Sequence, residues 1–91
     1  MPVLLVRADT LPKDFQPTHV RVTGSSVVND RLSLHDRESL LAFEAAKISV
    51  DRACRQAGIL PGDVDLFEVW DGFSIYAALS LEAACFAAPG E

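Results

Sequence analysis

The sequence predicts an α/β fold with the element order strand, strand, helix, strand, helix. Three observations support this order: two short apolar segments near the N-terminus, a long amphipathic segment in the middle, and an aromatic-rich segment followed by a second helical pattern. The chain has 91 residues, which is the length of one domain or of part of one, so we expect residues 1–91 to form a single domain or part of a domain.

The first two elements are predicted as strands. Residues 3–6 form a continuous apolar run, which is typical of a strand buried on both faces. Residues 10–18 contain two prolines and predict a loop. Residues 20–22 then alternate between valine and arginine as a half-buried strand does, and Gly24 is expected to mark a bulge or bend.

The third element is a helix predicted over residues 38–57. Its apolar residues recur at steps of three and four, which places them on one helical face. These residues are Leu40, Phe43, Ala46, Val50, Ala53, Cys54 and Ala57. Gly58 is expected to end the helix in the left-handed conformation, with Ile59 packing back on the last turn.

The last two elements are a strand and a helix that follow a turn at residues 60–63. Residues 66–70 are rich in aromatic and branched side chains, which favour a strand. Asp71 or Ser74 is expected to cap the second helix. Its shared face consists of Phe73, Tyr76, Ala77, Ser80, Ala84 and Ala87.

Composition and charge exclude several classes of function. The net charge of -5 argues against binding to nucleic acid or an anionic membrane surface, which needs clustered lysine and arginine. No stretch approaches the ~20 apolar residues of a membrane span, and the N-terminal run is too short for a signal peptide. Cys54 and Cys85 form no zinc or redox pattern, so we expect two buried thiols in a reducing cytoplasm.

Few residues stand out as candidates for chemistry. His19 and His35 are expected to have surface or capping roles, and the sequence predicts no metal site. Glu68 lies within an apolar strand, where it either points to solvent or serves as a polar group at the carboxyl end of that strand.

Open α/β sheets bind ligands at the carboxyl ends of their strands. The same rule selects the strand-to-helix junction, where backbone amides at the start of the second helix would face a crevice. The residues of this junction are Trp70, Asp71, Gly72 and Phe73. It is the site that the residues themselves favour.

Several motifs resemble one known family. They are Ala45-Ala46 and Ala53 in the first helix, Ala57-Gly58-Ile59-Leu60-Pro61-Gly62-Asp63-Val64-Asp65, Phe67-Glu68-Val69-Trp70-Asp71-Gly72-Phe73, Leu81-Glu82, and Phe86-Ala87-Ala88-Pro89-Gly90-Glu91. Together they resemble the C-terminal half of thiolases, in the branch of sterol carrier protein x that also includes acetyl-CoA acetyltransferases and nonspecific lipid-transfer proteins. Residues 3–6 and 20–24 are similar to the two strands that open this half.

The resemblance implies an enzyme of lipid metabolism that makes or breaks a carbon–carbon bond on an acyl-CoA thioester, with no other cofactor. Such enzymes use a nucleophilic Cys from the N-terminal half and a His in a Gly-His-Pro motif. Neither element matches this sequence: no Gly-His-Pro occurs, and Cys54 and Cys85 match no catalytic position. Cys85 replaces a glycine that usually precedes the position of Phe86.

One functional motif of the family does map onto this chain. The branch has His-Asp-Cys-Phe, and other thiolases have Asn-Glu-Ala-Phe, where the first residue helps to shape an oxyanion hole for the thioester. Trp70 and Asp71 occupy the catalytic part of this motif, and Gly72 and Phe73 the substrate-binding part. An indole N–H donates one hydrogen bond but cannot transfer a proton, so Trp70 departs from the family chemistry.

These observations favour a partial thiolase-like C-terminal domain, a fragment that is inactive alone, from a parent that acts on acyl-CoA. Two alternatives remain: a non-catalytic thiolase-fold interaction module, or part of a thiolase-like aldolase that acts on acyl-CoA. Unpaired strand edges and an uncovered apolar face lead us to expect a homo-oligomer or a complex with a complementing thiolase half.

Overall fold

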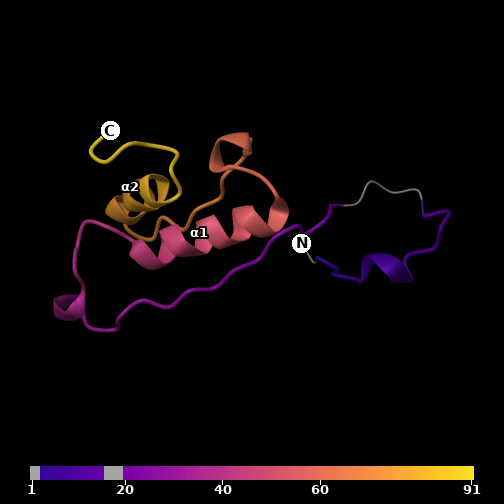
Figure 1. The fold of residues 1–91 in the computed structure, drawn as a ribbon, viewed down its shortest axis with the longest axis horizontal. Coiled ribbons are helices and arrows are strands. Elements are labelled where there is room, and N and C mark those ends of the chain that lie inside the picture. Colours follow the sequence, from indigo (N-terminus) through magenta and orange to yellow (C-terminus); the bar gives the residue numbers. More distant parts are fainter. Residues whose placement is uncertain (1–2, 16–19) are drawn as a thin grey trace.

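A computed structural model of the chain describes residues 3–15 and 20–91. Within these residues, extended or irregular segments join five helical elements, and no β-strand is formed. The α-helices are α1, Glu44–Ala57, and α2, Ser74–Ala83; the 3-10 helices are η1, Ala8–Thr10, η2, Leu34–Asp36, and η3, Pro61–Asp63. Figure 1 shows α1 at the centre, with the long segment that precedes it running alongside.

The predicted α/β class is wrong for the described chain, which is helical. Residues 3–6, 20–22 and 66–70 lie outside every helix, but none of them is paired as a strand. Within residues 3–15 and 20–91, no backbone–backbone hydrogen bond joins any two of these three segments. A strand forms only when a second backbone lies within hydrogen-bond distance, so the strand propensity of a segment does not produce a sheet by itself.

Helix α1 begins six residues later than predicted. Its first turn is closed by the Lys47 N–H, which donates to the Phe43 carbonyl at 3.0 Å. In the residues before it, the Leu41 N–H donates to the Ser39 hydroxyl at 3.1 Å. A serine side chain that bonds to the nearby backbone competes with helix formation, which explains the late start.

The C-terminus of α1 is where the sequence predicts it. Gly58 adopts φ 71°, in the left-handed region, and its N–H donates to the Arg55 carbonyl at 3.3 Å. The Ile59 N–H donates to the Cys54 carbonyl at 3.1 Å. This pair of bonds is the Schellman motif that a glycine at this position favours. The turn predicted next is present as η3.

Helix α2 is confirmed, but neither predicted residue caps it. Phe73 is the N-cap residue, and no side chain bonds to the free backbone amides of the first turn. At the other end, Cys85 has φ 63°, and the Phe86 N–H donates to the Leu81 carbonyl at 2.9 Å. Cys85 therefore occupies a left-handed position that glycine adopts with less strain.

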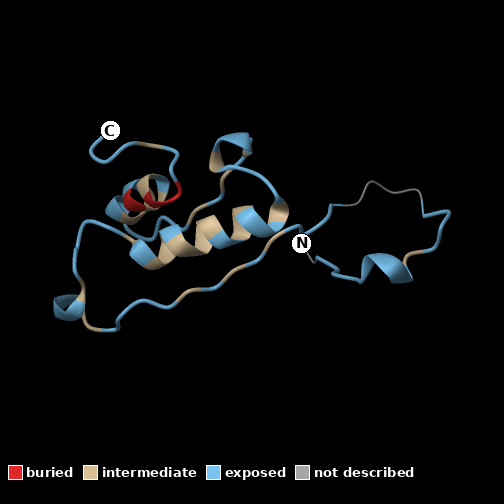
Figure 2. Cartoon of the chain, viewed as in Figure 1, coloured by how far each residue is buried: buried red, intermediate tan, exposed pale blue. Residues whose placement is uncertain are grey.

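The core is small and lies where α2 packs against α1. Its buried apolar residues within the described chain are Leu79, Ala83 and Ala84, and Figure 2 places them together in and just beyond α2. The accessible surface is 8065 Å², whereas a folded monomer of this mass exposes about 5,200 Å². The radius of gyration is 16.5 Å, against about 12 Å for a compact domain of this length. Much apolar surface is therefore uncovered.

The extended segment before α1 is attached to that helix at three neighbouring residues. A Cβ atom on Gly24 would lie 2.3 Å from the Ala53 carbonyl oxygen, so only glycine allows this approach. The Ser25 N–H donates to Gln56 Oε1 at 2.8 Å, and the Ser49 hydroxyl donates to the Ser26 carbonyl at 2.9 Å. The glycine that we expected at a bulge instead permits close packing on α1.

Candidate functional site

The predicted junction lies in a cluster of aromatic rings at the start of α2. The Trp70 ring is 5.6 Å from the Tyr76 ring and 6.3 Å from the Phe73 ring, measured between centroids. The Phe73 and Tyr76 rings are 5.2 Å apart at 78°. Phe43, which precedes α1, meets Tyr76 at 5.4 Å and 68°. The Trp70–Tyr76 pair is tilted at 42° and the other three pairs are edge-to-face, a favourable arrangement for aromatic rings, so the junction is a packed aromatic cluster.

Gly72 lies directly against the Trp70 side chain. A Cβ atom built on Gly72 would be 2.1 Å from the indole ring, so any larger residue would displace that ring. Trp70 is nevertheless 67% exposed and Phe73 is 62% exposed, which leaves both rings accessible to a ligand. Asp71 is also exposed. The junction therefore combines a fixed backbone with an open aromatic surface.

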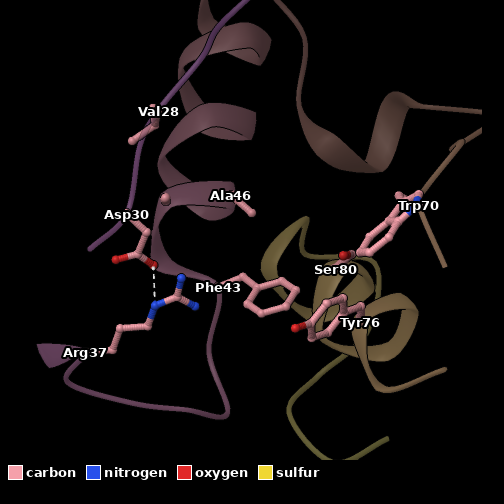
Figure 3. A pocket seen from close by; sticks show the side chains of 9 residues that line it. Val28, Asp30, Arg37, Phe43, Ala46, Trp70, Tyr76 and Ser80 are labelled. Atoms are coloured by element: carbon pink, nitrogen blue, oxygen red, sulfur yellow. Dashed lines mark ion pairs between the residues drawn. The ribbon is translucent and has the colours of Figure 1, made fainter. Parts of the chain in front are cut away.

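Three rings of this cluster, those of Phe43, Trp70 and Tyr76, form one wall of a cavity with a volume of about 360 Å³. The other three junction residues, Asp71, Gly72 and Phe73, are outside its lining. Its lining comprises Val28, Asp30, Arg37, Phe43, Ala45, Ala46, Trp70, Tyr76 and Ser80, shown in Figure 3. Opposite the aromatic rings, Arg37 Nε lies 3.9 Å from Asp30 Oδ2 and donates to the Arg31 carbonyl at 3.2 Å. The cavity is thus apolar on one side and carries an ion pair on the other.

The other candidate residues lie apart from this cavity. His35 is exposed on η2, with Nε2 3.6 Å from Asp36 Oδ1, which fits the predicted surface role. His19 lies outside the described residues. Glu68 is exposed, as its solvent-facing alternative predicts. Cys54 is half-buried and Cys85 is exposed, so the prediction of two buried thiols is wrong: neither residue is fully buried, and Cys85 is open to solvent. The cause of the exposure of Cys85 is its place at the end of α2, where the left-handed turn leads the chain away from the core.

Two further findings concern metals and membranes. No group of three or more metal-ligating side chains occurs in residues 3–15 and 20–91. In the same part of the chain, no helix combines the length and the apolar character that a membrane crossing needs.

The sequence located the junction but not the residues that join it from other elements. Tyr76 follows Phe73 by three residues, so their shared helical face was the signal that could have placed both in the site. Asp30 and Arg37 precede α1 in segments of irregular structure, where no periodicity predicts which way a side chain points. They reach the cavity because the chain folds back along α1. Phe43 belongs to the apolar periodicity predicted for the first helix and meets Tyr76 where α1 packs against α2.

Fold and site together define a two-helix unit with an aromatic-walled cavity at the N-terminus of its second helix. Residues 26–91 match the family described as "Thiolase C-terminal domain-like". This match covers α1, the junction and α2, and the chain belongs to this family.

Two curated relatives carry the name acetyl-CoA acetyltransferase. The protein from Methanothermobacter thermautotrophicus is 35% identical over 89 residues, which cover 98% of this chain and 23% of that protein. The protein from Methanocaldococcus jannaschii is 36% identical over 72 residues, which cover 79% of this chain and 18% of that protein. The chain spans less than a quarter of the length of either relative.

Proposed function

We propose that the chain supplies part of the acyl-CoA site of a thiolase-type acyltransferase and has no activity alone. The reaction class is the formation or cleavage of a carbon–carbon bond on an acyl-CoA thioester, in lipid metabolism in the cytoplasm, with no cofactor besides the thioester itself. The observation that carries this proposal is that Trp70, the first residue of the segment that resembles the family's thioester-binding motif, lines the aromatic cavity.

The roles of the four junction residues follow from their surroundings. Trp70 offers one indole N–H and a broad apolar face, so it would orient a thioester without moving a proton. Gly72 keeps the backbone close to the indole ring. Phe73 would contact the acyl chain, because its ring is exposed beside Tyr76. Asp71 would act only through its exposed carboxylate.

The residues that line the cavity support the proposal that the isolated chain is inactive. Among the described residues, this lining includes neither cysteine nor histidine. Thiolase chemistry requires a thiolate nucleophile and a general base at the thioester. A complementing thiolase half would have to bring both groups to the Trp70 side of the cavity. The chain by itself is therefore expected to bind a thioester weakly and to leave it unchanged.

Fluorescence titration tests the binding half of this proposal, because Trp70 is the only tryptophan of the chain. Acetyl-CoA should change the emission saturably, and the Tyr76→Ala variant should weaken that response. The matched control is Leu66→Ala, whose side chain is 87% exposed and outside the cavity. A linear response equal in all three proteins would contradict an acyl-CoA site.

Mass spectrometry and a turnover assay test the second half. After incubation with acetyl-CoA, the chain should keep its mass, and acetoacetyl-CoA should be neither formed nor cleaved. An added acetyl group on Cys54 or Cys85 would contradict inactivity while leaving the proposed binding site intact.

The second candidate is a non-catalytic thiolase-fold interaction module, favoured by the presence of Trp70 where the family places a polar or proton-handling residue. An aldolase-type parent acting on acyl-CoA shares the same binding site. The acetyl-CoA titration distinguishes the interaction module from both kinds of enzyme fragment, since an interaction module without a thioester site gives no saturable response to acetyl-CoA.

A further inference from the structure

Arg37 is the only basic residue among the described residues that line the cavity, and its side chain is largely withdrawn from solvent. The Arg37 side chain is 25% exposed, whereas that of Arg7, which also forms an ion pair, is 80% exposed. The Arg37 Nε–H donates to the Arg31 carbonyl at 3.2 Å, which fixes the guanidinium at the edge of the cavity. A charge that is already held in place loses little freedom when a ligand binds to it.

The terminal N–H groups of Arg37 have no acceptor within the described part of the chain. A guanidinium has five N–H donors, and Arg37 uses the one on Nε. Asp30 Oδ2 lies 3.9 Å from Nε, which is too long for a hydrogen bond. In Figure 3, Asp30 lies on the Nε side of the guanidinium, and the terminal nitrogens point toward Phe43. Acceptors for these donors therefore come from water or from a ligand in the cavity.

The cavity wall between Trp70 and Arg37 is aromatic. The Tyr76 ring lies 5.6 Å from the Trp70 ring and 5.4 Å from the Phe43 ring, so the three rings form a continuous surface. Figure 3 shows Arg37 and Trp70 at opposite sides of this surface. The cavity therefore has an indole N–H at one end, an apolar wall in the middle and a cation at the other end. Its volume of about 360 Å³ is at the small end of the range of about 300–1,000 Å³ for ligand pockets.

We propose that Arg37 determines specificity, and that the acyl group of the bound thioester ends in a carboxylate. This inference rests on the proposed function, in which Trp70 orients the thioester. An acyl chain that leads from Trp70 along Tyr76 and Phe43 ends beside the terminal N–H groups of Arg37. A carboxylate accepts two parallel N–H bonds from a guanidinium, whereas a methyl group accepts none. The substrate class is a CoA thioester of a dicarboxylic acid.

The charges around Arg37 are compatible with a second carboxylate. Asp30 Oδ1 accepts the Arg31 N–H at 2.7 Å, so the Asp30 carboxylate is held by the backbone and leaves the terminal donors of Arg37 open. The chain as a whole has a net charge of -5, which repels a negatively charged ligand. A preference for an acyl group with a terminal carboxylate would therefore require a local cation, and Arg37 is the one that the described lining provides.

Fluorescence titration of Trp70 tests the proposal with matched pairs of thioesters. Glutaryl-CoA is compared with pentanoyl-CoA, and succinyl-CoA with butyryl-CoA. The acyl groups of each pair have the same number of carbon atoms and end in a carboxylate or a methyl group. In at least one pair, the dicarboxylic thioester should bind at least about 10-fold more tightly. Saturable binding without this preference would overturn the inference and leave the acyl-CoA site, whereas no saturable response to any thioester would contradict both.

Three variants test whether Arg37 causes the preference. Arg37→Gln should abolish it. Asp30→Asn keeps the oxygen that accepts the Arg31 N–H and should increase the preference, because it removes a competing negative charge. Arg52→Gln removes a positive charge at an exposed position of α1 outside the cavity and should leave the preference unchanged.

The first two variants separate a role in binding from a role in structure. Arg37→Gln and Asp30→Asn both break the same ion pair, so a purely structural role predicts that the preference changes in the same direction in both. Changes in the same direction, or an Arg37→Gln variant that keeps the preference, would overturn the proposal. Far-UV circular dichroism checks that each variant keeps its helices.

Discussion

Two regions of this chain, residues 20–43 and residues 44–91, both contain many apolar side chains but have different structures. The second region forms α1 and α2 and holds every buried residue of the described chain. The first region is extended or irregular apart from η2, and its valines and leucines other than Val28 are exposed. The difference teaches that helices, whose hydrogen bonds are local, form from their own sequence, whereas an extended segment requires a partner.

The largest expected loss of stability comes from a substitution in the core of the helical region. Leu79→Ala should lower the free energy of unfolding by about 2–3 kcal/mol, because Leu79 is 7% exposed between α2 and α1. Leu32→Ala, at a side chain that is 98% exposed, should change it by less than about 0.5 kcal/mol. Denaturant titration followed by circular dichroism measures both. Equal losses would show that the first region is packed after all.

The next largest effect is expected from a substitution at the contact between the two regions. Gly24→Ala should detach the extended segment from α1, because the new methyl group meets the Ala53 carbonyl oxygen at 2.3 Å. We expect faster hydrogen exchange at the Ser25 amide, with a cost of about 1–2 kcal/mol. Gly62→Ala is the control, since its methyl group would meet open space. An unchanged exchange rate in Gly24→Ala would show that the segment is not fixed by this contact.

A third substitution distinguishes an accessible site from a core position. Trp70→His should leave the fold intact and cost about 1 kcal/mol, which is the loss of its contacts with Phe73 and Tyr76. A buried tryptophan would cost on the order of 3 kcal/mol instead. Thermal melts of both proteins decide between these values, and a large fall in melting temperature would mean that Trp70 is part of the core.

The smallest effects compare the two helix C-termini, which share a Schellman geometry but differ in the residue at the left-handed position. Gly58→Ala should destabilise the chain by about 0.5–1 kcal/mol, since the left-handed conformation strains any residue with a Cβ atom. Cys85→Gly should stabilise it by a similar amount for the same reason. Melting temperatures that move in opposite directions are expected, and a fall in both variants would contradict the strain at Cys85.

The sequence alone determined the features whose causes are local. It placed the end of α1 at Gly58, the turn that follows and the second helix, because periodicity and glycine conformation act within a few residues. It also determined the family, through motifs from Ala45 to Glu91. The sequence did not predict where α1 starts. The bond from the Leu41 N–H to the Ser39 hydroxyl competes with the helix, and it is one of several bonds that a serine can form.

Only the tertiary structure decided which segments meet. The extended segments stay unpaired within the described chain, because a backbone edge forms a sheet only beside another edge, and no local pattern supplies one. The same holds for the cavity: the Asp30–Arg37 ion pair faces the Trp70 side only because residues 24–28 fold back along α1, and Phe43 meets Tyr76 only because α1 packs against α2. Contacts between residues far apart in the chain depend on the path of the whole backbone, and periodicity within one segment does not contain that information.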